Sequence, residues 1–139
     1  MKKTIILAVS LLLSPVLAQA NVIPGMLEGY KAEGGSNFSA EAGKKMWNKE
    51  IAQEDGSKRS CTTCHNADVT KPGKHQRTGK VIAPMAPSAP FVAAEEGDEP
   101  RYSTEKKVEK WFKRNCKWTY GRECTVQEKG DFLMYLKDL

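Results

Sequence analysis

Five consecutive residues, Cys-Thr-Thr-Cys-His at positions 61–65, limit the folds and cofactors open to this chain. The spacing C-x-x-C-H is typical of covalent attachment of a c-type haem. Cys61 and Cys64 can each add to one vinyl group of the same porphyrin, and His65 can then present an imidazole to the iron. Neutral histidine is a common iron ligand in haem proteins. The motif therefore predicts one covalently bound haem c with His65 as the proximal ligand.

The same residues could instead supply half of the ligands of a zinc site, or form a redox-active dithiol. A zinc site needs further thiol or imidazole ligands at suitable spacing. A dithiol that exchanges with disulfides needs no histidine directly after it and usually lies in a βαβ unit. A disulfide oxidoreductase that uses Cys61 and Cys64 would require both thiols to be free in the mature protein.

The N-terminus has the organisation of a secretory signal peptide. A short basic start, Met1-Lys2-Lys3, precedes an apolar stretch over Thr4–Leu17, and Ala18-Gln19-Ala20 has the A-x-A form of a cleavage site. The apolar stretch is short for a membrane span, although an uncleaved anchor is the alternative. We expect residues 1–20 to be a signal peptide that is removed, and the mature chain to lie in the periplasm without a membrane span.

The other two cysteines, Cys116 and Cys124, stand eight positions apart. Neither belongs to a second C-x-x-C-H, so a second haem is excluded. Disulfides persist in oxidising compartments such as the periplasm. We expect a disulfide between these two residues, and two buried free thiols are the alternative.

Length and charge point to one small domain. Residues 21–37 are rich in glycine and weakly patterned, which predicts an N-terminal arm before a single domain over 38–139. The precursor has 22 Lys and Arg against 17 Asp and Glu, a net charge of +5. Cleavage would remove two lysines and haem propionates would lower the charge further, so the basic balance does not indicate nucleic-acid binding. No nucleic-acid motif is visible and we expect no such partner.

The pattern of the domain is mainly helical. Ser39 is a good N-cap for a helix over 40–51, and Ser103 or Thr104 can begin a second helix over 105–115. Thr125-Val126-Gln127-Glu128 is a capping box that opens a last helix. The Pro-rich segment 69–100 predicts a long loop. No segment has the alternation of a convincing strand.

These features together resemble a class I cytochrome c. Gly43 and Trp47 lie in the first predicted helix of the domain, the haem motif follows, and Leu133-x-Tyr135-Leu136 lies in the last helix. The resemblance implies a small, mainly α class I cytochrome c fold in which these two helices cross near the small glycine. Glycine lets two backbones approach closely.

Residues 38–139 resemble more specifically the oxygen-binding monohaem cytochromes called sphaeroides haem protein. The matching stretches are Thr78-Gly79-Lys80-Val81-Ile82-x-Pro84, Lys107 to Cys116 and Gly121-Arg122-Glu123-Cys124-Thr125. In that family the sixth iron ligand is an asparagine that directly precedes a disulfide cysteine. The resemblance implies that Asn115 has this role here, with a dihaem cytochrome c as the redox partner.

From the residues alone, two roles are open for Asn115. Helical spacing places it on one face with Val108, Trp111 and Phe112, where an amide needs a partner and iron could supply one. Asparagine also tolerates the left-handed conformation and could end the helix as a C-cap. Met85, in Pro84-Met85-Ala86-Pro87, is the main alternative sixth ligand.

Other residues of the long loop could reach the haem. His75 could approach the iron from the distal side, although a solvated loop histidine is the simpler interpretation. His75, Arg77 or Lys80 could instead meet a haem propionate. Lys71, Lys74 and Lys80 could steer an acidic partner protein toward the haem.

The functional hypotheses differ in what occupies the sixth coordination position of the haem iron and in whether that position can open. A plain electron carrier needs a stable six-coordinate haem, as Met85 and His65 would provide. A gas-binding haem protein needs a position that opens to oxygen or nitric oxide, as Asn115 would allow on reduction. The sequence favours electron transfer and gas binding over a true enzyme, and it names no catalysed reaction.

Overall fold

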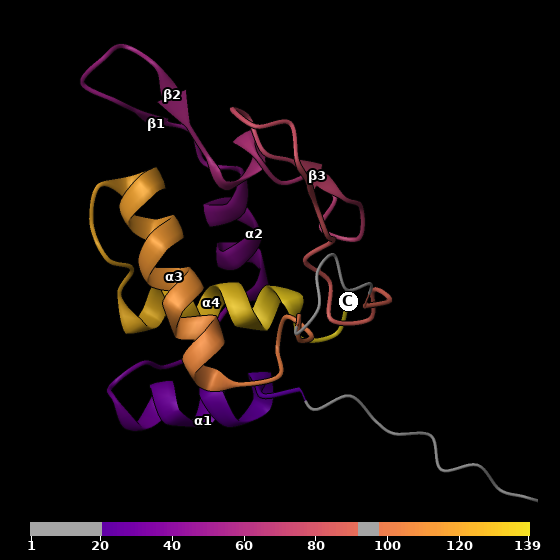
Figure 1. Cartoon of the computed structure of the whole chain (residues 1–139). Helices are drawn as coiled ribbons and strands as arrows, with labels where there is room; N and C mark the ends of the chain where they lie inside the picture. Colours follow the sequence, from indigo (N-terminus) through magenta and orange to yellow (C-terminus); the bar gives the residue numbers. More distant parts are fainter. Residues whose placement is uncertain (1–20, 92–97) are drawn as a thin grey trace, which may run out of the picture.

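The computed structural model describes residues 21–91 and 98–139, so the predicted signal peptide lies outside the described residues. It has a mainly α fold, as the sequence predicts, with helices at α1 Ile23–Ala32, α2 Ala40–Asn48, α3 Glu105–Tyr120 and α4 Val126–Leu136. A short 3-10 helix, η1, spans Cys61–Thr63. Helix α4 packs against both α2 and α1, while α3 crosses this group on another side (Figure 1).

The crossing of α2 and α4 occurs at Gly43, where the resemblance to class I cytochromes c places it. A Cβ atom on Gly43 would lie 2.2 Å from the backbone oxygen of Asp131 and 2.9 Å from the Cα of Phe132. Both distances are too short for any side chain. Next to this crossing, the Ser39 amide donates to the Asp131 carboxylate at 2.8 Å. The glycine therefore allows the two helix backbones to touch.

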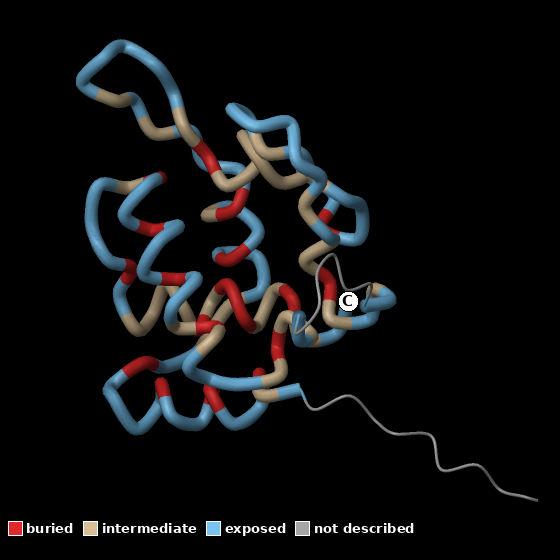
Figure 2. Tube along the Cα trace, viewed as in Figure 1, coloured by how far each residue is buried: buried red, intermediate tan, exposed pale blue. Residues whose placement is uncertain are grey.

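The N-terminal segment differs from the prediction of an irregular arm over residues 21–37. Residues Ile23–Ala32 form helix α1, which has Pro24 in its first turn, where a missing backbone N–H costs no helical hydrogen bond. Ile23, Met26, Leu27 and Tyr30 are buried in the common core (Figure 2). The spacing of these four residues is helical, but Gly25 and Gly29 obscure the pattern in the sequence. The helix forms because burial of the four side chains outweighs the low helix propensity of the two glycines.

Helix boundaries also differ from the predicted ones. Helix α2 begins after the N-cap Ser39 as predicted but ends at Asn48 rather than at Ile51. Helix α3 begins after Thr104, whose side chain accepts from the Lys107 amide, and continues to Tyr120 instead of stopping at Asn115. Gly121, with φ of 69°, ends it in the left-handed conformation. Asn115 is therefore inside the helix and is not a C-cap.

The last helix is capped as the sequence predicts. The Thr125 side chain accepts from the Glu128 backbone, and the Glu128 side chain accepts in return from the Thr125 amide. Its residues Phe132, Leu133 and Leu136 are buried in the core. The buried positions of α1, α2 and α4 meet where these helices pack together.

Two short antiparallel hairpins, which the sequence analysis did not predict, flank the haem motif. Strand β1, Ile51–Ala52, pairs with β2, Lys58–Arg59. Strand β3, Gly73–Lys74, pairs with β4, Val81–Ile82, inside the predicted loop over 69–100. Each strand has two residues, too short for an alternating pattern to show in the sequence.

Among the described helices, none combines the length and the apolar character needed to cross a membrane.

Candidate haem site

The described residues enclose a large cavity of about 1460 Å³, bounded by the haem motif, the loop after it and one face of α3. This volume exceeds that of most small-molecule sites, which span about 300–1,000 Å³. Its apolar wall includes Trp47, Phe112, Phe132 and Leu133. Cys61, Cys64 and His65 all line the same cavity. A large apolar space with two thiols and an imidazole at its wall has the size and donor set that a haem c requires.

A cap on the short helix η1 orients the two cysteines. The Ser60 amide donates to Thr63 Oγ1 at 2.9 Å, and the Thr63 amide donates back to the Ser60 backbone oxygen at 3.1 Å. The His65 amide donates to the Cys61 oxygen at 3.1 Å, which turns the chain once between these residues. The thiols and the imidazole are therefore presented by one compact turn.

Strand β3 fixes this turn from outside, and Gly73 makes that contact possible. A Cβ atom on Gly73 would lie 2.3 Å from the Cys64 oxygen and 2.6 Å from the His65 Cα. The next residue, Lys74, donates its amide to the Cys64 oxygen at 2.7 Å. Sequence analysis missed Gly73, although the dipeptide Pro72-Gly73 is a turn signal that marks the position.

Trp47 connects the haem motif to the core. Its indole nitrogen donates to the Asn66 oxygen at 3.1 Å. Its ring lies 5.2 Å from the His65 ring and 5.3 Å from the Phe132 ring, centroid to centroid. The residue after His65 is thus hydrogen-bonded to Trp47 of α2, and the His65 ring lies against the ring of the same tryptophan.

Burial favours the uncharged forms of His65 and Cys61. It lowers the pKa of His65 to about 4, with a further contribution from the positive charge of Arg101. It also raises the pKa of the Cys61 thiol to about 11. A neutral imidazole is the form that binds iron.

Asn115 reaches the cavity from the opposite end of the sequence. It lies in α3, and with Val108, Trp111 and Phe112 it lines the cavity, as the helical spacing predicts. Trp118, one turn further on, lines the cavity as well. The face that carries Asn115 is therefore turned toward the same space as His65.

Met85 and His75 also line the cavity. Each of these residues forms hydrogen bonds to neighbouring residues. The Met85 amide donates to the Val69 oxygen at 2.8 Å, and its own oxygen accepts from the Tyr102 hydroxyl at 2.6 Å. His75 Nδ1 accepts from the Thr78 amide at 3.2 Å in the turn between β3 and β4. Arg77 and Lys80, the other residues expected near a propionate, line the cavity from this turn.

Arg101 is a cavity residue that sequence analysis missed. Its guanidinium donates to the Ala83 oxygen at 2.9 Å, and burial lowers its pKa. No carboxylate among the described residues forms an ion pair with it. A half-buried cation at the cavity wall fits a haem propionate, but no sequence pattern around Pro100-Arg101-Tyr102 marks it.

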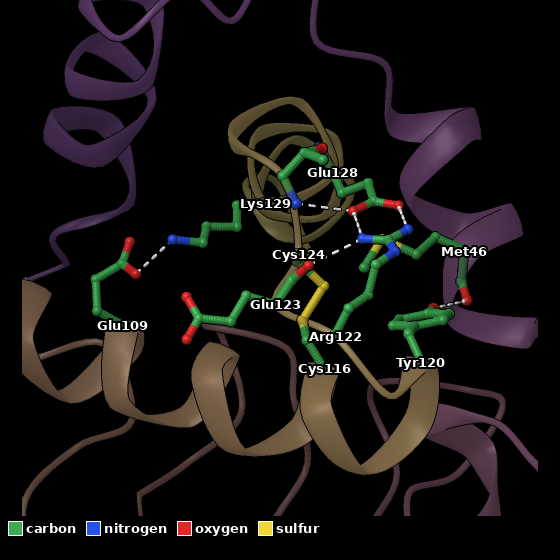
Figure 3. Close-up of a disulfide and its surroundings, with 10 residues drawn as sticks. Met46, Glu109, Cys116, Tyr120, Arg122, Glu123, Cys124, Glu128 and Lys129 are labelled. Atoms are coloured by element: carbon green, nitrogen blue, oxygen red, sulfur yellow. Dashed lines mark hydrogen bonds and ion pairs between the residues drawn. A yellow bond between two sulfur atoms is a disulfide. The ribbon is translucent and has the colours of Figure 1, made fainter.

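The disulfide expected from the sequence is present in the structure and joins Cys116 of α3 to Cys124 before α4 (Figure 3). Close to it, the Tyr120 hydroxyl donates to the Met46 oxygen of α2 at 2.9 Å. Arg122 forms two hydrogen bonds with the Glu128 carboxylate, at 2.6 and 2.7 Å. These contacts fasten the C-terminal end of α3, just beyond Asn115.

Within the described residues, no group of three or more His, Cys, Asp or Glu side chains comes together as a metal cluster. The zinc alternative for Cys61 and Cys64 therefore lacks its additional ligands there. The residues at the cavity wall fit a haem instead.

Comparison with known proteins agrees with this site. Residues 33–136 match a family described as a domain of unknown function (DUF1924). The chain is 40% identical over 130 residues to the cytochrome c-type protein SHP of Cereibacter sphaeroides, covering 91% of this chain and 92% of that protein. It is 31% identical over 94 residues to cytochrome c'' of Methylophilus methylotrophus, covering 68% of this chain and 60% of that one.

Solved structures show the same fold. The structure of oxidised SHP, described as an oxygen-binding cytochrome c, matches with a TM-score of 0.68 and 39% identity over 84% of this chain and 96% of that chain. Oxidised cytochrome c'' of Methylophilus methylotrophus matches with a TM-score of 0.70 and 26% identity, over 84% and 93% of the two chains. The fold and the cavity thus define a class I c-type cytochrome. More specifically, the chain belongs to the SHP family of monohaem cytochromes, and it carries one covalently bound haem c.

Proposed function

We propose that this protein is a periplasmic cytochrome that couples electron transfer to the binding of oxygen or nitric oxide at its haem iron. Cys61 and Cys64 would hold the haem, and His65 and Asn115 would bind its iron. A dihaem cytochrome c, implied by the family, is the redox partner. The haem supplies an iron that changes between the ferric and ferrous states and accepts a diatomic ligand in the ferrous state.

The observation that carries this proposal is the position of Asn115. It comes from α3, whereas His65 follows η1, and both residues line one cavity. Helix α3 is long enough to place Asn115 on a regular turn, because it continues past this residue to Tyr120. The oxygen-binding description of the related SHP structure agrees with a displaceable ligand.

The chemistry of an amide explains why the ligand can leave. The Asn115 side chain offers a neutral amide oxygen, a harder donor than the sulfur of methionine. Such a donor favours ferric over ferrous iron, so the reduction potential should lie below that of a haem with Met and His ligands. Reduction would then weaken the bond to Asn115, whose N–H groups could donate to an incoming ligand.

A plain electron carrier with Met85 as sixth ligand is the competing function. Met85 lines the cavity, which is the observation in its favour. Its amide is bonded to Val69, four residues after His65, and its oxygen to Tyr102. A sixth ligand has to approach the iron from the side opposite His65, and this local anchoring next to the His65 segment favours a packing role for Met85.

Two alanine variants of the holoprotein separate these functions. Asn115→Ala should leave the ferric iron open to water and to added cyanide, whereas Met85→Ala should leave the ferric absorption and electron paramagnetic resonance spectra close to wild type. Loss of the sixth ligand in Met85→Ala, with none in Asn115→Ala, would show that the protein is an ordinary electron carrier.

A further inference from the structure

The positive charge of this chain is concentrated on helix α3. Its 16 residues contain six Lys and Arg and two Glu, a net charge of +4, against +5 for the whole sequence. We call these six residues the basic face of α3: Lys106, Lys107, Lys110, Lys113, Arg114 and Lys117. All are exposed except Lys107, which is half-buried.

Helical geometry brings these cations to one side. Lys106, Lys110, Lys113 and Lys117 follow one another at steps of four, three and four residues, so they form a row along the helix. The buried positions Val108, Phe112, Cys116 and Thr119 lie on another side. This row of four lysines is thus the solvent side of a helix whose other sides face the core and the haem cavity.

Much of this charge is not balanced locally. Lys113 and Lys117 share Glu123, at 3.9 and 3.4 Å, and these pairs are well exposed. Such exposed pairs contribute little stability and can exchange partners. No carboxylate of the described residues lies within ion-pair distance of Lys106, Lys110 or Arg114.

The basic face is also hollowed. A cavity of about 260 Å³ is lined by Lys106, Lys110, Lys113 and Lys129, together with Glu109, Glu123 and Cys124. Lys129 is paired with Glu109 at 2.7 Å (Figure 3). Four lysines around one hollow can receive an acidic side chain that projects from another protein.

The same face continues to the haem cavity. Lys107 and Arg114 line that cavity, and Arg114 directly precedes Asn115. The Arg114 guanidinium lies 5.0 Å from the centroid of the Trp111 ring, another cavity residue. A protein bound to the basic face would therefore lie next to the haem.

We propose that the basic face of α3 is the docking surface for an acidic redox protein. This inference rests on the proposed electron-transfer function and names the chemistry of its partner. In the encounter the partner loses one electron and the haem iron takes it up, passing from ferric to ferrous. Charge complementarity of this kind increases association rates roughly 10- to 1,000-fold at low salt.

The face differs from the lysines that the sequence analysis considered. Lys71, Lys74 and Lys80 belong to the loop around β3 and β4, and Lys71 is paired with Asp68 at 3.8 Å. Six cations along one helix, anchored by the Cys116–Cys124 disulfide, present a more regular target. Lys71 and Lys74, together with the exposed Lys49 after α2, lie outside the haem cavity and therefore provide a matched control.

The test uses holoprotein and a reduced plant-type [2Fe–2S] ferredoxin, a small acidic one-electron donor of low potential. Lys106→Gln/Lys110→Gln/Lys113→Gln is compared with a loop variant, Lys49→Gln/Lys71→Gln/Lys74→Gln, which removes the same charge but no residue of the haem cavity. Stopped-flow absorption follows haem reduction at several salt concentrations. Binding of oxidised ferredoxin, measured by isothermal titration calorimetry, provides a readout that needs no electron transfer.

The α3 variant should reduce at least roughly tenfold more slowly than wild type at low salt, with weaker salt dependence and weaker ferredoxin binding. The loop variant should stay within about twofold of wild type, and a small neutral quinol should reduce all three proteins equally. A larger loss in the loop variant, or equal losses in both, would overturn the docking surface.

Two further outcomes separate this proposal from the function on which it rests. If wild type accepts electrons from the quinol but ferredoxin does not bind it, the docking proposal fails and the electron-transfer function stands. If wild type cannot be reduced by either donor, the proposed function itself fails.

Binding of anionic lipid vesicles in place of ferredoxin would identify the basic face as a membrane-surface site and would also overturn the proposal.

Discussion

Close backbone contacts at two glycines position the haem-binding elements. Gly43 lets α2 touch α4, and this crossing carries Trp47 to the side of His65. Gly73 lets β3 touch the backbone of Cys64 and His65 themselves. A methyl group at either position would meet backbone atoms, which cannot move aside as a side-chain end can. The positions of Trp47 and His65 therefore depend on residues that have no side chain.

Gly73→Ala should disturb haem attachment. Its new Cβ would lie 2.3 Å from the Cys64 oxygen, so the motif or the strand has to shift. We expect a lower haem content and a drop in unfolding free energy of about 1–3 kcal/mol. Haem absorption of the purified protein and urea unfolding measure the two effects.

Gly29→Ala is the control for that substitution. Gly29 lies in α1, and a Cβ there would meet nothing within 4 Å. Alanine has the higher helix propensity, so this variant should be as stable as wild type or more stable by up to about 1 kcal/mol. Normal haem content in Gly73→Ala would contradict the positioning role of Gly73.

At the scale of elements, the connection between α3 and α4 determines where Asn115 lies. The disulfide ties α3 to the turn before α4, and both of its cysteines are buried. At the other end of α3, the Tyr30 hydroxyl of α1 donates to Glu109, whose other oxygen accepts from Lys129 of α4. Helix α3 is thus fastened to its neighbours near both ends, and it lines the cavity from Lys107 to Thr119.

Removing the disulfide should destabilise the protein and loosen Asn115. The double variant Cys116→Ser/Cys124→Ser should lose about 2–4 kcal/mol of unfolding free energy, because the unfolded chain is no longer constrained. Its ferric spectrum should also change if Asn115 is the sixth ligand. Urea unfolding and absorption spectroscopy provide the measurements, and two titratable thiols in native wild type would contradict the linkage.

The Arg122–Glu128 pair should make stability depend on acidity. The Arg122 guanidinium, more than the Thr125 amide, lowers the pKa of Glu128 from its ordinary 4.5 to about 2. Because the folded pKa lies below the unfolded one, the pair's contribution is present above pH 4.5 and disappears as the pH falls toward 2. The midpoint temperature of wild type should therefore fall more steeply over this range than that of Glu128→Gln.

The control for this pH dependence is Glu41→Gln. Glu41 also occupies the first turn of a helix, α2, but forms no ion pair with a described residue. Its variant should retain the wild-type slope. Equal slopes in wild type and Glu128→Gln would show that the pair contributes nothing to acid stability.

At the scale of the whole molecule, the described residues form one core. Helix α1 supplies Ile23 and Leu27 to the same cluster as Trp47 of α2 and Leu133 of α4. The Val22 amide also donates to the Tyr102 oxygen at 3.1 Å, next to the cavity residue Arg101. The segment expected as an arm is therefore part of the common core, and it is hydrogen-bonded to the residue that follows Arg101.

The exported protein should have the mass of residues 21–139 plus one haem. The prediction combines the A-x-A site at 18–20 with attachment at Cys61 and Cys64. Mass spectrometry of periplasmic protein measures it, and Cys61→Ser/Cys64→Ser should lack the added haem. A mature mass without haem in wild type would contradict the attachment, and an intact N-terminus would contradict the cleavage.

The sequence by itself determined the cofactor and the outline of the helical domain. C-x-x-C-H is a contiguous motif, so its chemistry needs no tertiary contact to be recognised. The caps at Ser39, Thr104 and Thr125 are also local, because each side chain bonds to a backbone only three residues away. The helical spacing of Val108, Trp111 and Asn115 predicted their common face for the same reason.

Only the tertiary structure decided what depends on residues far apart in the chain. Helix α1 forms because Ile23, Leu27 and Tyr30 are buried against other elements, and its two glycines hide this from a propensity argument. Helix α3 continues past Asn115 because it can end at Gly121, after the disulfide cysteine. Gly73 and Arg101 meet the haem site through contacts with backbone atoms that no local pattern encodes. A cavity is a property of how elements pack, and for that reason the sequence could not specify Arg101 as part of its polar wall.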